Sequence, residues 1–107
     1  MEAMAIPIMP GKFDAWAAWV DELKGPRKAD FEDMNARLEI TTHATWHQQT
    51  PDGGHMAIVV VDGPGAATLM QKLATSDNEF DMWFRSNAQD VHPVDFSALP
   101  PPPERRL

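Results

Sequence analysis

Apolar side chains recur every three or four residues in four stretches of the chain, a pattern that predicts amphipathic helices. These stretches span residues 13–23, 26–38, 66–73 and 76–91. Gly25-Pro26 separates the first two, because Gly suits the left-handed cap of a helix and Pro suits the first position of the next one. Ser76 and Glu79 have the spacing of a capping box, so we expect Ser76 to begin the last helix.

Four other segments are rich in β-branched or alternating apolar residues and predict strands. They span residues 5–9, 40–49, 55–62 and 94–97. Between the second and third, residues 50–54 read Thr-Pro-Asp-Gly-Gly, which predicts a tight turn. Pro presets one backbone dihedral there, and Asp-Gly tolerates a positive φ. These two strands should therefore form a hairpin.

The elements follow the order strand, broken helix, strand, strand, broken helix, strand, which is a β-α-β unit twice. Right-handed crossovers then predict an α+β, ferredoxin-like split β-α-β fold, with a four-stranded antiparallel sheet and the broken helices on one face. The other sheet face is too apolar to stay in water. A second copy would cover it, which predicts a homodimeric α/β barrel. We expect one domain over residues 1–98 and a proline-rich tail over residues 99–107.

The register of the hairpin decides which side chains share a face. If Gln49 pairs with His55, then His47 and His55 are diagonal neighbours on one face, ~7–8 Å apart at Cα. That face would also hold His43, Thr45, Ala57, Val59 and Val61. Its mixture of small apolar residues and histidines suits the lining of a cavity or of the dimer barrel. Trp46 falls on the opposite face, where we expect it to pack under the helices.

Composition narrows the choice of partners and compartment. The 107 residues include 9 Lys and Arg against 16 Asp and Glu, a net charge of −7. Such a chain disfavours nucleic acid and anionic membranes, so we expect neither as a partner. The absence of Cys excludes disulfides, thiolate metal sites and thiol catalysis. The N-terminus does not resemble a signal peptide and no apolar run reaches ~18 residues, so we expect a cytoplasmic protein.

Several short motifs resemble a group of uncharacterised bacterial proteins in the dimeric α/β-barrel superfamily. They are Gly25-Pro26-Arg27, Arg37-Leu38-x-Ile40-Thr41, Trp46, Gln49-Thr50-Pro51-Asp52-Gly53 and Phe80-Asp81-x-Trp83-Phe84. The resemblance implies a cavity between helices and sheet. It also implies a place among cofactor-free quinol and polyketide monooxygenases, polyketide cyclases, haem-degrading enzymes and stress-responsive proteins. The sequence departs from the group at His47, where an apolar residue is usual.

Histidines are the candidates for chemistry, because neutral imidazole transfers protons near pH 7. If the protein is an enzyme, we expect His43 and His47 to be the catalytic residues, as general base and polar anchor. The alternative is that they face solvent or form hydrogen bonds at a subunit interface. His47 and His55 could both reach one metal ion, but no third ligand follows from the sequence. We therefore assign no metal and no cofactor.

Four further residues are predicted to contact a ligand. Trp19 and Trp83 could stack an aromatic molecule, Arg37 could anchor a carboxylate, and His92 could border a cavity at the end of the last helix. The alternatives are core packing for the two tryptophans, an intersubunit ion pair for Arg37 and a contact with the helix dipole for His92. The hypothesis is a protein that binds a small apolar or aromatic molecule between helices and sheet, with cofactor-free oxygenation or cyclase-type proton transfer as its chemistry. The alternative is a non-catalytic homodimeric module, stress-responsive or ligand-storing.

Overall fold

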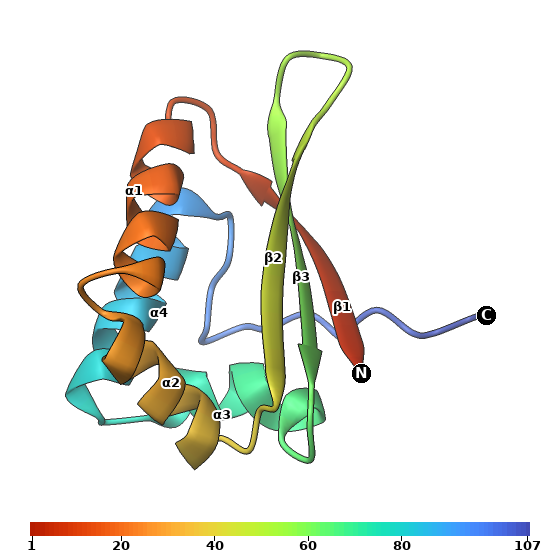
Figure 1. The fold of residues 1–107 in the computed structure, drawn as a ribbon. Coiled ribbons are helices and arrows are strands. Elements are labelled where there is room, and N and C mark those ends of the chain that lie inside the picture. The colour runs from red at the N-terminus through yellow and green to blue at the C-terminus, as the bar shows by residue number, and fades with distance from the viewer.

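The helices and the sheet form two layers, shown in Figure 1. A computed structural model describes all 107 residues of the chain. In chain order the elements are β1 (Glu2–Ile8), α1 (Phe13–Lys24), α2 (Lys28–Arg37), β2 (Thr42–Gln49), β3 (His55–Asp62), the 3-10 turn η1 (Ala66–Thr68), α3 (Leu69–Thr75) and α4 (Glu79–Val91). The four α-helices lie on one side of the sheet, and the C-terminus ends on the other side (Figure 1).

The sheet has three antiparallel strands in the order β1-β3-β2. β3 is central because its run of Ile58 to Val61 is the most apolar segment of the chain and needs neighbours on both edges. The predicted hairpin register is confirmed, since Gln49 pairs with His55. Pro7 lies on β1, an edge strand, where its missing N–H is tolerated.

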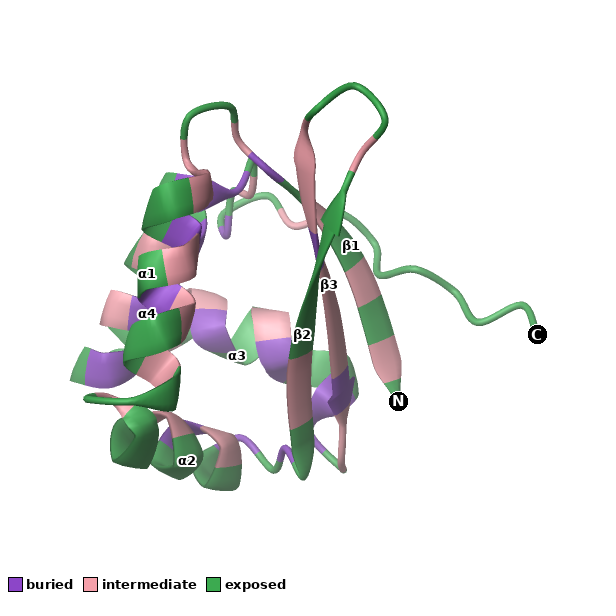
Figure 2. Cartoon of the chain, turned by 45° about the horizontal axis from the view of Figure 1, so that its top comes forward, coloured by how far each residue is buried: buried purple, intermediate pink, exposed green.

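A single core lies between the two layers, and Figure 2 shows buried residues interspersed with exposed ones along the helices. From the sheet, Ala57 and Val61 point into this core and are almost completely buried. Met34 on α2 and Leu73 on α3 belong to the same core cluster and are equally buried. The interior between helices and sheet is therefore occupied by side chains.

The prediction of a four-stranded ferredoxin-like sheet is wrong, because the sheet has three strands, and this single chain shows no dimeric barrel. Residues 94–97 turn back on themselves and add no strand. Their polar groups form local hydrogen bonds, from the Val94 N–H to the His92 carbonyl and from the Ala98 N–H to the Asp95 carbonyl. Phe96 is buried and belongs to the core cluster. Backbone groups of the segment are therefore hydrogen-bonded within the turn, and the segment does not pair with the sheet. As a result, β1 remains an open edge strand in this single chain.

The face expected to meet the helices is also reversed. Trp46 is 56% exposed and points away from the helices, together with its cross-strand partner Ile58. The helices cover the opposite face of the sheet. That face carries His43 and His47 on β2 and Ala57 on the central strand β3. Alternation places residues on a shared face, but the choice of the covered face depends on the helices.

The start of α4 differs from the capping-box prediction. Asn78 is the N-cap, and its side-chain oxygen accepts hydrogen bonds from the N–H groups of Phe80 and Asp81. The hydroxyl of Ser76 instead donates to Asp81 at 2.7 Å.

None of the helices combines the length and the apolar character that crossing a bilayer needs.

Candidate functional site: a histidine pair beside a groove

Two histidines contact each other across the β2–β3 hairpin. Because Gln49 pairs with His55, His47 lies diagonally opposite His55 on the helix-facing side of the ladder. The Nε2 atom of His47 lies 2.9 Å from the Nδ1 atom of His55, a hydrogen-bond distance. One of these nitrogens must donate its N–H and the other must accept with a free lone pair. The pair therefore carries its protons in a defined, linked arrangement.

Aromatic rings from the first turns of α1 cover this pair. The ring of Phe13 stacks on His55 at 4.4 Å between centroids and approaches His47 at 4.7 Å. Trp16, one helical turn later, is 5.8 Å from His47 and is buried. Both imidazoles therefore have an apolar wall on the helical side. Despite this wall, His47 is exposed to solvent and His55 is half-buried.

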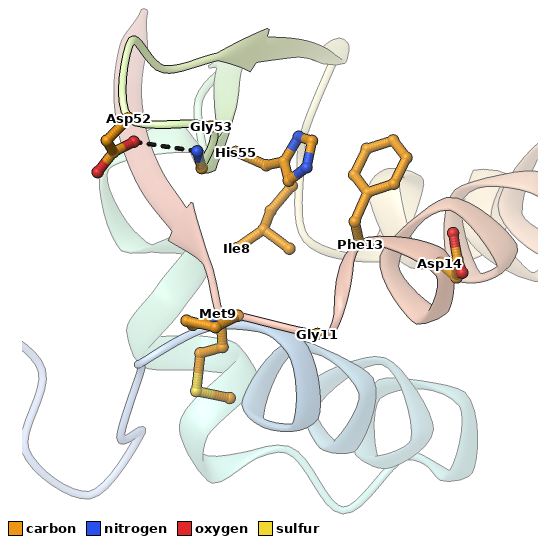
Figure 3. Close-up of a pocket in the computed structure, with 10 residues that line it drawn as sticks. Ile8, Met9, Gly11, Phe13, Asp14, Asp52, Gly53 and His55 are labelled. Atoms are coloured by element: carbon orange, nitrogen blue, oxygen red, sulfur yellow. Dashed lines mark hydrogen bonds between the residues drawn. The ribbon is translucent and has the colours of Figure 1, made fainter.

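A groove of about 640 Å³ opens next to the pair. It lies between the loop from β1 to α1 and the turn of the β2–β3 hairpin. Figure 3 shows the rings of His55 and Phe13 side by side above Ile8. The remaining lining residues are Met9, Pro10, Gly11, Asp14, Asp52, Gly53 and Gly54. The volume falls within the ~300–1,000 Å³ of ordinary ligand clefts.

The charges around the groove are negative. Asp14 and Asp52 line it and no Lys or Arg does. Hydrogen bonds from the Thr50 hydroxyl and the Gly54 N–H hold the pKa of Asp52 below its ordinary value, so this carboxylate is charged near neutral pH. An anionic ligand would be repelled here, whereas a neutral or cationic one would be accepted.

The second nitrogen of His55, Nε2, makes no hydrogen bond within the chain, because only Nδ1 is engaged by His47. His55 is also the one histidine of the pair that lines the groove. A ligand lying on Phe13 would meet a donor or an acceptor at this position, depending on the tautomer. The arrangement can bind an aromatic molecule and exchange a proton with it.

The other predicted catalytic residue, His43, lies elsewhere in the layer. Its Nδ1 is 2.9 Å from the side-chain oxygen of Asn35, and its ring packs against Phe31 at 4.9 Å. Because an amide oxygen only accepts, Nδ1 of His43 carries the hydrogen. Burial lowers the pKa of His43 to about 4, so the ring is neutral at pH 7. The structure does not bring His43 and His47 together.

His92 follows the last turn of α4 and is buried. Its Nδ1 donates to the carbonyl oxygen of Pro7 at 2.8 Å and so ties the end of α4 to β1. Burial lowers the pKa of His92, against the smaller opposing effect of this hydrogen bond. The ring is therefore neutral, and it fastens two elements rather than interacting with the helix dipole as a cation.

Trp19 and Trp83, the predicted aromatic clamp, do not face each other. Trp19 is buried and packs edge-on against Phe84 at 4.9 Å. Trp83 instead lies under the guanidinium of Arg27, 4.3 Å from the ring centroid. The third predicted ligand anchor, Arg37, donates to Asp33 and Asp81. None of these three side chains lines the groove.

Sequence reasoning found His47 and His55 but missed Phe13 as their partner. The helical periodicity predicts Phe13 only as the first apolar residue of a stripe. Its contact with the imidazoles arises because α1 begins at the turn end of the β2–β3 hairpin, and this placement needs the tertiary structure. The only feature of the sequence that could have indicated a role for Phe13 is its position directly after the loop that contains Gly11.

The chain matches no family model, no curated protein and no solved structure with which it was compared. The resemblance to the dimeric α/β-barrel superfamily therefore stays a prediction. The groove and the histidine pair are the features of the chain that bear on its function. Fold-level analogy would be a weak warrant even with a match, because one architecture hosts many activities.

Proposed function

We propose that the protein binds a small aromatic molecule that is neutral or cationic and carries a hydroxyl group. The observation that carries this proposal is the contact between His55 and Phe13 on the wall of the groove. The ring of the ligand would lie against Phe13 and Ile8, and its hydroxyl would meet the free Nε2 of His55. The acidic rim supplied by Asp14 and Asp52 selects against carboxylates.

The histidine pair supports a proton-transfer chemistry for the same site. If Nδ1 of His55 donates to His47, Nε2 of His55 is free to accept a proton from the bound hydroxyl. Transfer of the Nδ1 proton to Nε2 of His47 then leaves His55 neutral and moves the charge to the exposed ring. Deprotonation of a phenol or enol is the step that cofactor-free oxygenation and cyclase-type chemistry share. His47 and His55 are the residues proposed to perform it.

The binding proposal is tested with 2-naphthol as the neutral probe and 2-naphthoate as its anionic counterpart. Two-dimensional ¹H–¹⁵N spectra of the protein would be recorded during titration with each compound. We expect saturable shifts for the amides of Gly11, Gly53 and His55 with 2-naphthol. The shifts should be much weaker with 2-naphthoate, because the negative rim repels it.

Variants distinguish binding in the groove from nonspecific binding of 2-naphthol elsewhere on the protein. Phe13→Leu and His55→Gln should each weaken 2-naphthol binding, since they remove the stacking surface and the polar contact. Gln49→Ala is the matched control, because Gln49 pairs with His55 but does not line the groove. Shifts that map to the open sheet face around Trp46, or equal affinity for both compounds, would contradict the proposal.

A second proposal, self-association through the sheet, rests on a different observation. The face of the sheet opposite the helices is uncovered and carries no charged side chain between the ends of its strands. Its residues are Ala3, Ala5, Pro7, Ala44, Trp46, Gln48, Met56, Ile58 and Val60. In a chain of net charge −7, an uncharged face is where two copies approach with least repulsion. A second copy of this chain is therefore the proposed occupant.

The dimer should be weak, because three strands of this length present a face of only about 26 by 14 Å. Sedimentation velocity over a concentration series should show a reversible monomer–dimer equilibrium. Trp46→Asp should abolish it. Met82→Asp is the control, since Met82 is also exposed but lies on α4. A wild-type protein that stays monomeric at millimolar concentration, or equal loss in both variants, would contradict this proposal.

A further inference from the structure

The histidine pair has a geometry that goes beyond binding an organic molecule. Its two facing nitrogens, Nε2 of His47 and Nδ1 of His55, are 2.9 Å apart. Two imidazole nitrogens bound at right angles to one ion, each at ~2.0–2.1 Å, are also about 2.9 Å apart. A tetrahedral ion would need a separation of about 3.3 Å at the same bond length. The spacing is that of the hydrogen bond between the rings, and it also matches two adjacent positions of a tetragonal metal centre.

We infer that His47 and His55 form a two-imidazole site for a divalent transition metal, with Cu²⁺ as the preferred ion. Cu²⁺ favours tetragonal coordination by nitrogen ligands and binds such ligands most strongly among the first-row divalent ions. Hard ions such as Mg²⁺ and Ca²⁺ prefer oxygen ligands, so they should not compete. No group of three or more His, Asp, Glu or Cys side chains gathers around one point in the chain. Water would fill the remaining positions on the exposed side.

The surroundings of the pair favour this role. The two histidines lie on adjacent, hydrogen-bonded strands, so the backbone already holds them at chelating distance. Phe13 stacks on His55, contacts His47 at a tilt, and closes the helical side of the site. The other side is open, because His47 is exposed. An ion can therefore enter without any opening of the fold.

Metal binding needs a small rearrangement with a defined proton balance. In the metal-free pair, one of the two facing nitrogens carries a hydrogen and points at the other. To bind an ion, that ring loses this hydrogen and takes one up at its second nitrogen, which leaves both rings neutral overall. Both lone pairs then turn from each other towards the metal. No proton is released in sum, and no oxidant or reductant is needed.

The experiment is a titration of the untagged protein with Cu²⁺ at pH 7.5, followed by tryptophan fluorescence and electron paramagnetic resonance. Trp16 lies 5.8 Å from His47, so a bound Cu²⁺ should quench part of the emission. The resonance spectrum should show a tetragonal centre with two imidazole nitrogens at one ion per chain. His47→Gln and His55→Gln should each weaken binding at least about tenfold, as the loss of one ligand implies.

Gln49→Ala is the matched control, because it lies on the same strand and face two residues beyond His47. It should bind Cu²⁺ like the wild type, and Mg²⁺ should leave the emission unchanged. Circular dichroism checks that each variant is folded. The inference is overturned if the folded double variant His47→Gln with His55→Gln binds Cu²⁺ as tightly as the wild type, or if the spectrum shows no imidazole nitrogen. The outcome is independent of 2-naphthol binding, which is measured without metal.

Discussion

Arg37 on α2 and Asp81 on α4 form a doubly hydrogen-bonded ion pair across 44 residues of sequence. The two bonds are 3.0 Å and 2.8 Å long, and Asp81 is 0% exposed. Burial alone would raise the pKa of Asp81, but the hydrogen bonds from Arg37 and Ser76 outweigh it and lower the pKa. The carboxylate is therefore charged in the fold, and Arg37 is the side chain that makes its burial possible.

Replacing Arg37 should be far more damaging than its partial exposure suggests. Arg37→Met leaves the charged Asp81 without its partner and should lower the free energy of unfolding by about 2–4 kcal/mol, a value reduced for solvent at Arg37. Asp33→Asn is the control, because Asp33 binds the same guanidinium from an exposed position. It should cost less than ~1 kcal/mol. Urea unfolding measures both, and similar losses in the two variants would contradict this account.

The protein should lose stability as the pH falls from 7 to 5, in part through His43. The unfolded chain binds a proton near pKa 6.5, whereas in the fold the pKa of His43 is about 4. The unfolded state is therefore favoured by protonation in this window, by about 2 kcal/mol for this residue. His43→Gln should remove that part of the pH dependence. Urea unfolding at pH 7 and pH 5 tests it, and an unchanged difference between the two pH values would argue against a buried neutral ring.

Gly65 should not tolerate a side chain, although its backbone conformation is ordinary. A Cβ atom there would overlap the carbonyl oxygen of Leu38, because the chain after β3 passes directly against the end of α2. Gly65→Ala should therefore destabilise the protein by about 2–4 kcal/mol through the forced backbone shift. Gly11→Ala is the comparison, since Gly11 has a φ of +78° but open space around it. It should cost only ~1–2 kcal/mol, and thermal unfolding should rank the two variants in this order.

Arg27 and Trp83 should be energetically coupled. The guanidinium lies 4.3 Å from the ring centroid of Trp83 and 5.2 Å from that of Phe80. A cation over an aromatic face at such a site contributes ~0.5–2 kcal/mol. A double-mutant cycle with Arg27→Met and Trp83→Leu should give a coupling energy in that range. Additive effects of the two substitutions would show that the contact contributes packing alone.

Much of the candidate site was predictable from local rules. The Pro-Asp-Gly turn set the hairpin, the hairpin set the pairing of Gln49 with His55, and that pairing placed His47 beside His55. The ion pair of Asp81 was not predictable in the same way. Spacing along the helix favours Arg85 as its partner, yet Arg85 donates to the carbonyl oxygens of Leu73 and Ser76 instead. The true partner, Arg37, comes from another helix.

The sequence by itself determined the helices, the hairpin and which side chains share each strand face, because these follow from periodicity and turn chemistry within about ten residues. Only the tertiary structure decided that the helices cover the histidine face and leave Trp46 outside. It also decided that residues 94–97 fold back instead of joining the sheet, and that Phe13 lies on the histidine pair. Period-two alternation is symmetric between the two faces of a strand, and the packing of distant segments breaks that symmetry.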